Sequence, residues 1–386
     1  MKIALLSDCY LPRLGGIEVQ VHDLAARLIG RGHEVVVFTA TPGSRGERGG
    51  FVDQVDGIAV HRLALRLPFE LPVNPLAPRL LRQRLLGGGF DVAHIHMGVV
   101  SPFAVDCTRV ATDVGLPTAM TWHCMLGPFE QLFRAAGYVR NWAAHGVAMS
   151  AVSAVAAEPL QRIVGSAGMV NVLPNGIDVE RWATAPGQGP AREPGGGVRV
   201  VSAMRLAARK RPLPLLRTMA RVRALVPADI GIRLELFGDG PDRRRLERFV
   251  AAHDMAGWVL LPGRVTRQEL RERYAAADIY VAPAPLESFG IAALEARTVG
   301  LPVVGRRGSG VQEFVEDGLN GYLAADDEAM AGCLARLVAD DGLRGSMTAY
   351  NRSTPPEQSW DRILDVAEAE YGRAIAVAES AVQATR

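Results

Sequence analysis

The sequence predicts an α/β protein with two doubly wound domains that face a cleft. Short apolar runs, typical of buried parallel strands, alternate with stretches of helical periodicity along most of the 386 residues. A break at residues 185–197, APGQGPAREPGGG, separates two such series, because its prolines and glycines allow neither a helix nor a central strand. We therefore expect a first domain over residues 1–184, a linker over residues 185–197 and a second domain over residues 198–356.

The first series starts with an apolar run at residues 3–6, which predicts a strand. Gly15 and Gly16 lie in the loop that follows, and apolar residues at helical spacing then predict a helix that ends near Gly30. The same alternation predicts further strands at residues 35–38, 92–95, 118–121 and 147–152.

The second series repeats this pattern after the break. Its predicted strands lie at residues 198–202, 233–237, 259–261, 279–282 and 302–304. A last helix, from Trp360 to about Val382, could pack on either domain, and we expect the segment 357–386 to cross back to the first. In doubly wound sheets ligands bind at the carboxyl ends of the strands, so a substrate is expected in the cleft.

Composition excludes several classes of protein. The 43 Lys and Arg residues nearly balance the 41 Asp and Glu residues, which argues against a dedicated nucleic-acid binder. The four cysteines lie far apart without C-x-x-C spacing, which indicates neither a disulfide scaffold nor a zinc site. With no apolar stretch long enough for a signal peptide or a membrane span, we expect a cytoplasmic protein, at most peripheral at the inner face of the membrane.

The segment 283–300, PAPLESFGIAALEARTVG, is the most informative about chemistry. Glu287 ends a loop after an apolar strand, Gly290 opens a helix, and Glu295 lies about one and a half turns inside that helix. The free N–H groups of Phe289, Gly290 and Ile291 would face the same cleft as Glu287, which suits a ligand with hydroxyls and negative charge. Two glutamates eight residues apart are also common by chance on a solvated helix face.

Here the sequence resembles the GT-B retaining glycosyltransferases of family 4. That family has a Glu-x7-Glu element, which Glu287 to Glu295 match with the wording E-S-F-G-I-A-x-L-E-A. The resemblance covers nearly the whole chain and implies two Rossmann-like domains, with the donor on the second and the acceptor mostly on the first. The other matching segments are Pro12 with Gly15 and Gly16, Asp91 to His96, Val172 to Asp178, Phe237 to Pro241, and Gly318 to Gly321.

The resemblance also implies roles for the donor site. Glu287 and the neighbouring backbone amides would hold the sugar hydroxyls, and Glu295 would hold the ribose. Arg205 and Lys210 would neutralise the diphosphate as it leaves, since fixed cations aimed at developing negative charge lower the barrier. Methionine precedes Arg205 where glycine is usual, and Arg-Pro replaces the glycine after Lys210, so Arg209 and Arg211 remain alternatives.

Lysine itself is rare in this chain. Only Lys2 and Lys210 are lysines among the 43 basic residues, and one of them falls at the position where the family places its lysine. Because a compact ammonium is not simply replaced by arginine, this favours a specific role for Lys210 over a solvated basic loop.

His123 and the first glycine loop are the candidates in the first domain. The family places a histidine at the position of His123, near the donor sugar and the scissile bond, which implies transition-state positioning and not general base catalysis. Without that resemblance, a histidine beside a strand is more often structural. At Gly15 and Gly16, backbone N–H groups could approach a phosphate or the acceptor, or the pair could simply form a tight turn.

Two further features bear on partners. The chain has no D-x-D triplet, so we expect no metal and no cofactor beyond the nucleotide-sugar donor, a GDP- or UDP-sugar. Residues 76–86 combine leucines with Arg79, Arg82 and Arg84, which is typical of a cationic helix on anionic lipid and equally of a half-buried surface helix.

The sequence thus predicts a retaining hexosyltransferase, with mannose from GDP-mannose weakly favoured over glucose or N-acetylglucosamine from a UDP donor. The acceptor would be a hydroxyl of a glycan, a lipid or a small molecule. A nucleotide-sugar epimerase and a sugar phosphorylase or synthase share this architecture and remain alternatives. A dehydrogenase is disfavoured because the first loop lacks G-x-G-x-x-G, and a non-catalytic binding module because both domains carry motif residues.

Overall fold

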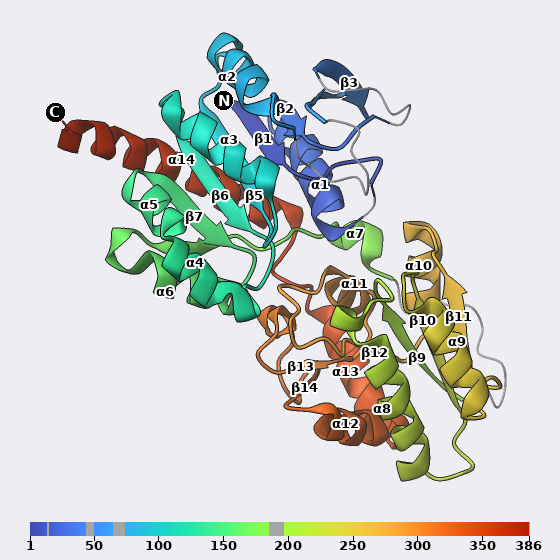
Figure 1. Cartoon of the computed structure of the whole chain (residues 1–386). Helices are drawn as coiled ribbons and strands as arrows, with labels where there is room; N and C mark the ends of the chain where they lie inside the picture. The colour runs from blue at the N-terminus through green and yellow to red at the C-terminus, as the bar shows by residue number, and fades with distance from the viewer. Residues whose placement is uncertain (14, 44–49, 65–73, 185–196, 386) are drawn as a thin grey trace. The chain divides into compact units, whose positions relative to one another are not determined.

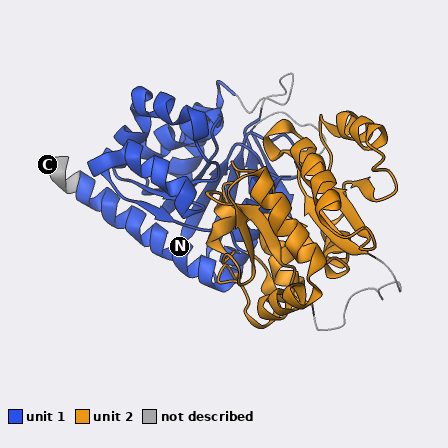
Figure 2. Cartoon of the chain, turned by 90° about the horizontal axis from the view of Figure 1, so that it is seen from below, with its two compact units in different colours: residues 1–176, 360–386 blue, residues 177–359 orange. Residues whose placement is uncertain are grey.

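The computed structural model describes the chain except for residues 14, 44–49, 65–73, 185–196 and 386. The chain forms two compact units (Figure 2). Residues 1–176 with 360–386 make up unit 1, and residues 177–359 make up unit 2. Each unit is an α/β domain with a largely parallel sheet, as the sequence predicts. The predicted linker lies almost wholly outside the described residues.

The first boundary between the units falls at Gly176 and Ile177, earlier than the predicted end of the first domain at residue 184. Residues 177–184, with the short helix α7 (Val179–Trp182), belong to unit 2 because their contacts lie there. The Trp182 ring lies 6.1 Å from that of Tyr274, and the Thr184 hydroxyl donates to the carbonyl of Val299.

Unit 1 contains, among the described residues, an eight-stranded sheet in the order β3-β4-β2-β1-β5-β6-β7-β8. Figure 1 labels most of these strands. All neighbouring strands are parallel except β3 and β4, which form an antiparallel hairpin that was not predicted from the sequence. The hairpin turn uses Asp56 and Gly57, both at positive φ. The strands are β1 (Lys2–Ser7), β2 (Glu34–Thr39), β3 (Phe51–Val55), β4 (Ile58–Arg62), β5 (Val92–Met97), β6 (Thr118–Trp122), β7 (Val147–Ala151) and β8 (Val170–Val172).

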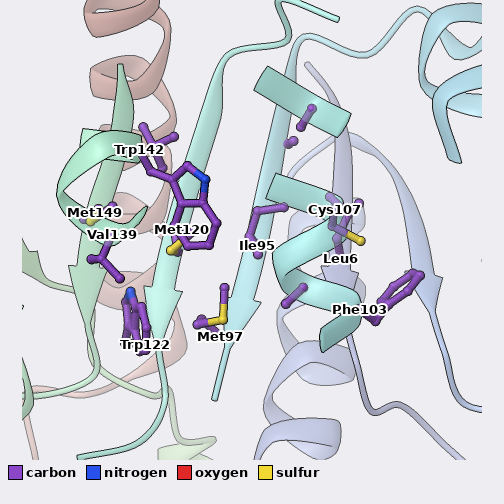
Figure 3. Close-up of a cluster of buried hydrophobic side chains, with 14 of the residues drawn as sticks. Leu6, Ile95, Met97, Phe103, Cys107, Met120, Trp122, Val139, Trp142 and Met149 are labelled. Carbon is purple, nitrogen blue, oxygen red and sulfur yellow. The ribbon is translucent and has the colours of Figure 1, made fainter. Parts of the chain in front are cut away.

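Helices cover both faces of this sheet. One face packs on a large apolar core that includes Ile95, Met97, Met120 and Trp122 (Figure 3). The other face is covered by α1 and by the C-terminal helix α14, which returns to unit 1 and packs against β5, β6 and β7. The helices are α1 (Gly16–Gly30), α2 (Ala77–Gly88), α3 (Pro102–Asp113), α4 (Glu130–Ala136), α5 (Tyr138–Ala144), α6 (Ala154–Val164) and α14 (Trp360–Thr385).

Unit 2 has a six-stranded parallel sheet in its described residues, in the order β11-β10-β9-β12-β13-β14. The strand order reverses between β9 and β12, so the loops that follow these two neighbouring strands meet at the point where doubly wound sheets bind ligands. Its strands are β9 (Val198–Ala203), β10 (Ile232–Phe237), β11 (Val259–Gly263), β12 (Ile279–Val281), β13 (Val303–Arg306) and β14 (Gly321–Ala324). Besides α7, its helices are α8 (Pro212–Leu225), α9 (Arg243–Ala252), α10 (Arg267–Ala275), α11 (Ile291–Val299), α12 (Asp327–Ala339) and α13 (Asp341–Ser353).

The cationic helix predicted near residues 76–86 is α2. Its leucine stripe is only partly available to a partner, because Leu81 and Leu85 are buried in the core of unit 1. Leu76 and Leu86 are exposed, as are the three arginines of the segment. Across the described ranges of the chain, no helix combines the length and the apolar character needed to cross a bilayer.

Candidate active site

The predicted donor residues of unit 2 gather where the strand order reverses. Arg205 and Lys210 follow β9, and Glu287 follows the neighbouring strand β12. The Nζ of Lys210 lies 2.5 Å from Oε2 of Glu287, with 34% of the lysine side chain and 19% of the glutamate side chain exposed. A partly exposed cation and carboxylate are thus placed together at the edge of the sheet where ligands bind.

The backbone of the loop that carries Arg205 is held by the segment Phe237 to Pro241. The N–H of Met204 donates to the carbonyl of Phe237, and the N–H of Leu206 donates to that of Asp239, both at 3.0 Å. A Cβ on Gly238 would lie 1.9 Å from the Met204 carbonyl oxygen, so only glycine permits this approach. The loop is therefore fixed, while the Arg205 side chain itself is exposed.

Arg211 occupies the position after Lys210 where the family pattern usually has glycine. It has φ 62° and ψ 40° at the start of α8, a left-handed conformation that favours the glycine usual at this position. Its guanidinium pairs with Asp327 at 2.5 Å, and Arg306 pairs with the other oxygen of the same carboxylate at 2.9 Å. Arg211 is therefore engaged with a second carboxylate, Arg209 is exposed, and Lys210 is the cation that pairs with Glu287.

Glycines also shape the loop between Glu287 and α11. The N–H of Gly310 donates to the Glu287 carbonyl at 2.7 Å, and a Cβ on Gly310 would lie 2.2 Å from the Ser288 carbonyl oxygen. Gly290 caps α11 with φ 93°. The side chain of Phe289 is buried against Phe314, so only its backbone is available to a ligand.

The amides predicted to bind a ligand lie at the start of α11. The first N–H groups of a helix have no acceptor within it and carry partial positive charge, which suits the hydroxyls and phosphates of a nucleotide sugar. Ile291, the first residue of this helix, is half-buried. Glu295 lies further along the same helix, mostly buried, and Nη2 of Arg267 is 3.9 Å from its Oε1.

In unit 1, Gly15 caps the start of α1 and Gly16 is the first residue of this helix, after the loop that follows β1. Gly15 is extended, and a Cβ there would lie 2.3 Å from Oε2 of Glu18. The buried Glu18 carboxylate therefore folds over the start of α1, and Nε of Arg13 lies 3.3 Å from its Oε1. Glu18 was not among the sequence-predicted residues, although an acidic residue in the first helical turn is a recognisable signal.

His123 directly follows β6 and is buried. Its Nε2 lies 2.9 Å from Nδ1 of His96, which is at the end of the neighbouring strand β5. Burial lowers the pKa of His123 to about 4 and the pKa of His96 well below its ordinary value, so both rings are neutral near pH 7. His96 belongs to the family motif at Asp91 to His96, but no role was predicted for it.

Comparison with known proteins matches both halves of the chain. Residues 14–181 match the family described as Glycosyltransferase Family 4, and residues 190–354 match the one described as Glycosyl transferases group 1. A D-inositol 3-phosphate glycosyltransferase of Xylanimonas cellulosilytica is 30% identical over 399 residues, which cover 91% of this chain and 91% of the relative. The chain belongs to glycosyltransferase family 4.

A second relative and a solved structure are also similar to this family 4 glycosyltransferase. The phosphatidyl-myo-inositol mannosyltransferase of Mycolicibacterium smegmatis is 27% identical over 392 residues, covering 98% of this chain and 96% of the relative. The crystal structure of Anabaena HepE in complex with UDP and glucose has a TM-score of 0.73 and 19% identity, covering 96% of this chain and 99% of that chain. At this identity the likeness shows the fold, which is GT-B.

The structure therefore brings predicted residues into contact in unit 2, whereas in unit 1 it shows no contact between His123 and the glycine pair among the described residues. In unit 2, Arg205, Lys210 and Glu287 lie on loops at the reversal point, and Gly290 starts the adjoining helix. No group of three or more His, Cys, Asp and Glu side chains is placed to hold a metal ion within the described parts of this glycosyltransferase. That the reaction needs no metal stays a prediction.

Proposed function

We propose that this glycosyltransferase moves a hexose from a nucleotide sugar to an acceptor hydroxyl with retention of anomeric configuration. The observation that carries the proposal is the 2.5 Å contact between Lys210 and Glu287 where the strand order of unit 2 reverses. A cation for the diphosphate and a carboxylate for the sugar hydroxyls are the two groups that a nucleotide-sugar site needs side by side.

In the proposed reaction the bond between sugar C1 and the diphosphate oxygen breaks, and its electron pair stays with the phosphate. Arg205 and Lys210 stabilise the negative charge that develops there, and the start of α11 adds backbone N–H groups. The acceptor oxygen bonds to C1 on the face that the phosphate leaves, and its proton passes to a donor phosphate oxygen. His123 orients the sugar in the transition state, and Glu295 binds the ribose.

For the donor we propose GDP-mannose first, with UDP-glucose and UDP-N-acetylglucosamine as the other candidates. Support comes from the mannosyltransferase of Mycolicibacterium smegmatis among the relatives, and from a structural neighbour named with UDP and glucose. For the acceptor we propose a hydroxyl of a glycan, a lipid or a small molecule. An inositol-containing acceptor is the first to try, because two of the relatives are named for inositol acceptors.

If the acceptor is a lipid, the exposed face of α2 would guide the enzyme to the membrane. This face presents Arg79, Arg82 and Arg84 with Leu76 and Leu86, which suits an anionic surface. Sedimentation with liposomes tests it, using phosphatidylglycerol mixed with phosphatidylcholine at low salt. The wild type should pellet and a triple alanine variant of the arginines should stay in the supernatant; equal sedimentation of both contradicts the role of α2.

The test of the function is a transfer assay. The full chain is incubated with GDP-mannose, UDP-glucose or UDP-N-acetylglucosamine and with inositol, inositol phosphate, phosphatidylinositol vesicles or simple glycans, and products are detected by mass spectrometry. We expect a hexosylated acceptor and free nucleoside diphosphate, unchanged when EDTA is added. Recovery of an epimerised donor without transfer would support an epimerase instead, and loss of transfer in EDTA would contradict metal independence.

A further inference from the structure

A buried polar network lies on the face of the unit 1 sheet that α14 covers. Along β5 the side chains alternate, so Ile95 and Met97 point into the apolar core on one face (Figure 3), and His94 and His96 point to the other. His94 there meets Tyr371 of α14, with ring centroids 5.4 Å apart. Two consecutive inward positions of a central strand are thus histidines.

The proton positions on His94 follow from its partners. The Ser150 hydroxyl donates to the Met120 carbonyl at 3.2 Å, so its oxygen accepts from the Thr121 hydroxyl, 2.8 Å away. Thr121 has then used its own hydrogen and accepts from Nε2 of His94 at 2.8 Å, while Nδ1 of His94 accepts from the Tyr371 hydroxyl at 3.0 Å. With Ser150 donating to the Met120 carbonyl, His94 is the Nε2–H tautomer.

His96 lies between this chain of hydrogen bonds and His123. Its ring centroid is 4.2 Å from that of His94, and its Nδ1 lies 2.9 Å from Nε2 of His123. Its own Nε2 is buried and has no hydrogen-bond partner among the described residues. Each neutral ring carries one N–H, so either His96 donates to His123 or His123 donates to His96.

The buried Nε2 of His96 decides between these two directions. If His123 donated, His96 would carry its proton on Nε2, which would bury an N–H group without an acceptor. Buried orphan N–H groups are rarer in proteins than acceptors without a donor. The favoured arrangement is therefore Nδ1–H of His96 donating to Nε2 of His123.

We propose that His96 is a positioning residue, which holds His123 as the Nδ1–H tautomer and fixes the orientation of its ring. His123 then carries its donor on Nδ1, and the lone pair of its Nε2 is occupied by His96, so His123 cannot act as a general base through Nε2. The catalytic consequence rests on the proposed function, whereas the tautomer is a property of the folded protein alone.

A small cavity adjoins the network. His94, His96 and His123 line it together with Gln20 and Trp360, and it has room for about one water molecule. A water in this cavity that donates to Nε2 of His96 would fit the assigned direction, whereas a water that accepts from an N–H there would fit the reverse direction, and the NMR measurement below distinguishes the two. The side-chain amide of Gln20 is itself engaged with both backbone groups of Gly176, at 3.0 Å each.

The direct test is NMR of the full chain labelled with ¹⁵N-histidine, with the His123 signals assigned by their loss in His123→Gln. Long-range proton–nitrogen correlations distinguish a protonated ring nitrogen from a bare one. We expect His123 protonated on Nδ1 and bare on Nε2 near pH 7. Protonation of His123 on Nε2 would overturn the proposal, whether or not the enzyme transfers a hexose.

Variants test the consequence for catalysis. His96→Asn places an amide N–H near the position of Nδ1, and His96→Leu removes the donor. We expect His96→Leu to lower kcat roughly tenfold with the KM for the nucleotide sugar within about twofold, and His96→Asn to restore most of the rate. Equal losses in both variants would mean that the donor is irrelevant and would contradict the positioning role.

His61 provides the matched control. It is a half-buried histidine on β4, which β2 and β1 separate from β5, and its pKa is also lowered by burial, to about 4. His61→Leu should keep the wild-type kcat and the wild-type tautomer of His123. Full activity of His123→Ala would overturn the catalytic role of His123 in the proposed function, while the spectrum would still decide the assignment for His96.

Discussion

Nζ of Lys210 and Oε2 of Glu287 lie 2.5 Å apart, although 77 residues separate them in the sequence. The contact exists because β9 and β12 are neighbours at the reversal of strand order, which brings their following loops together. In the absence of a donor the two charges stabilise each other. In the proposed function, the ammonium turns to the diphosphate and the carboxylate to the sugar hydroxyls when a nucleotide sugar binds.

Removing either partner of this pair should reduce transfer with the fold intact. We expect Lys210→Met and Glu287→Gln each to lower kcat/KM by about 100-fold or more, since each removes a group that stabilises the transition state. Lys210→Arg should not restore the rate, because a planar guanidinium does not replace a compact ammonium. Initial rates of nucleotide release measure this.

The control for these variants is another ion pair of unit 2. Arg221 of α8 pairs with Glu328 of α12, and both side chains are more than half exposed. Arg221→Met and Glu328→Gln should keep kcat/KM within about twofold, as expected for an exposed pair. Near-wild-type turnover in Lys210→Met and Glu287→Gln as well would refute the proposed site.

Arg211 should be more tolerant of glycine than of alanine. Both substitutions remove the pair with Asp327, but only glycine is free of strain at φ 62°. We expect Arg211→Gly to be more stable than Arg211→Ala by about 1 kcal/mol in the free energy of unfolding, measured with urea. Both variants should keep the donor KM within about threefold. If a variant of Arg211 were as inactive as Lys210→Met, the role assigned to Lys210 would belong to Arg211 as well, which would contradict the assignment.

Gly310 is expected to be essential for the geometry of the Glu287 loop. A Cβ at this position would lie 2.2 Å from the Ser288 carbonyl oxygen and 2.5 Å from Cα of Phe289, and neither is a flexible side-chain end. Gly310→Ala should therefore displace the loop and lower kcat/KM by about tenfold or more. Gly332→Ala is the matched control, because nothing lies within 4 Å of the new Cβ in α12. Equal rates for the two variants would contradict this account of the loop.

The buried histidines should make stability depend on pH. Burial lowers the pKa of His94 from 6.5 to about 3, so below pH 6.5 the unfolded chain takes up a proton that the folded protein does not. Stability is therefore lost as the pH falls from 6.5, by about 1 kcal/mol per pH unit for each such histidine. Asp8, whose pKa burial raises to about 6, acts in the opposite direction because the folded state takes up its proton first.

Urea unfolding between pH 7 and pH 4.5 measures this dependence. His94→Gln should lose less stability per pH unit than the wild type, by about 1 kcal/mol. His253→Gln, which removes an exposed histidine, should follow the wild-type slope. If the slopes of His94→Gln and the wild type coincide, His94 is not held neutral by burial.

Much of the fold could be predicted because its signals are local. Buried parallel strands are recognisable as apolar runs, and the sequence E-S-F-G predicts Glu287 on a loop before a helix. The hairpin of β3 and β4 was missed because the residues of β3 alternate between exposed and half-buried and form no apolar run. The unit boundary was misplaced because it depends on contacts between distant residues, such as Trp182 with Tyr274.

Candidate site residues could be proposed from the sequence, but the contacts between them could not. Sequence pattern singled out Lys210 and Glu287 separately, and only the sheet order shows that they meet. No role was predicted for Glu18 or His96, for a related reason. Their importance depends on what the fold places against them, which is Gly15 for the carboxylate and His123 for the ring.

The most direct test of the central claim is calorimetric titration of the full chain with GDP-mannose, UDP-glucose and UDP-N-acetylglucosamine. We expect one of these donors to bind with 1:1 stoichiometry, and Lys210→Met and Glu287→Gln each to weaken that binding by about tenfold or more, or roughly 1.4 kcal/mol. Undiminished binding of the same donor in both variants would contradict the claim that these residues hold the nucleotide sugar.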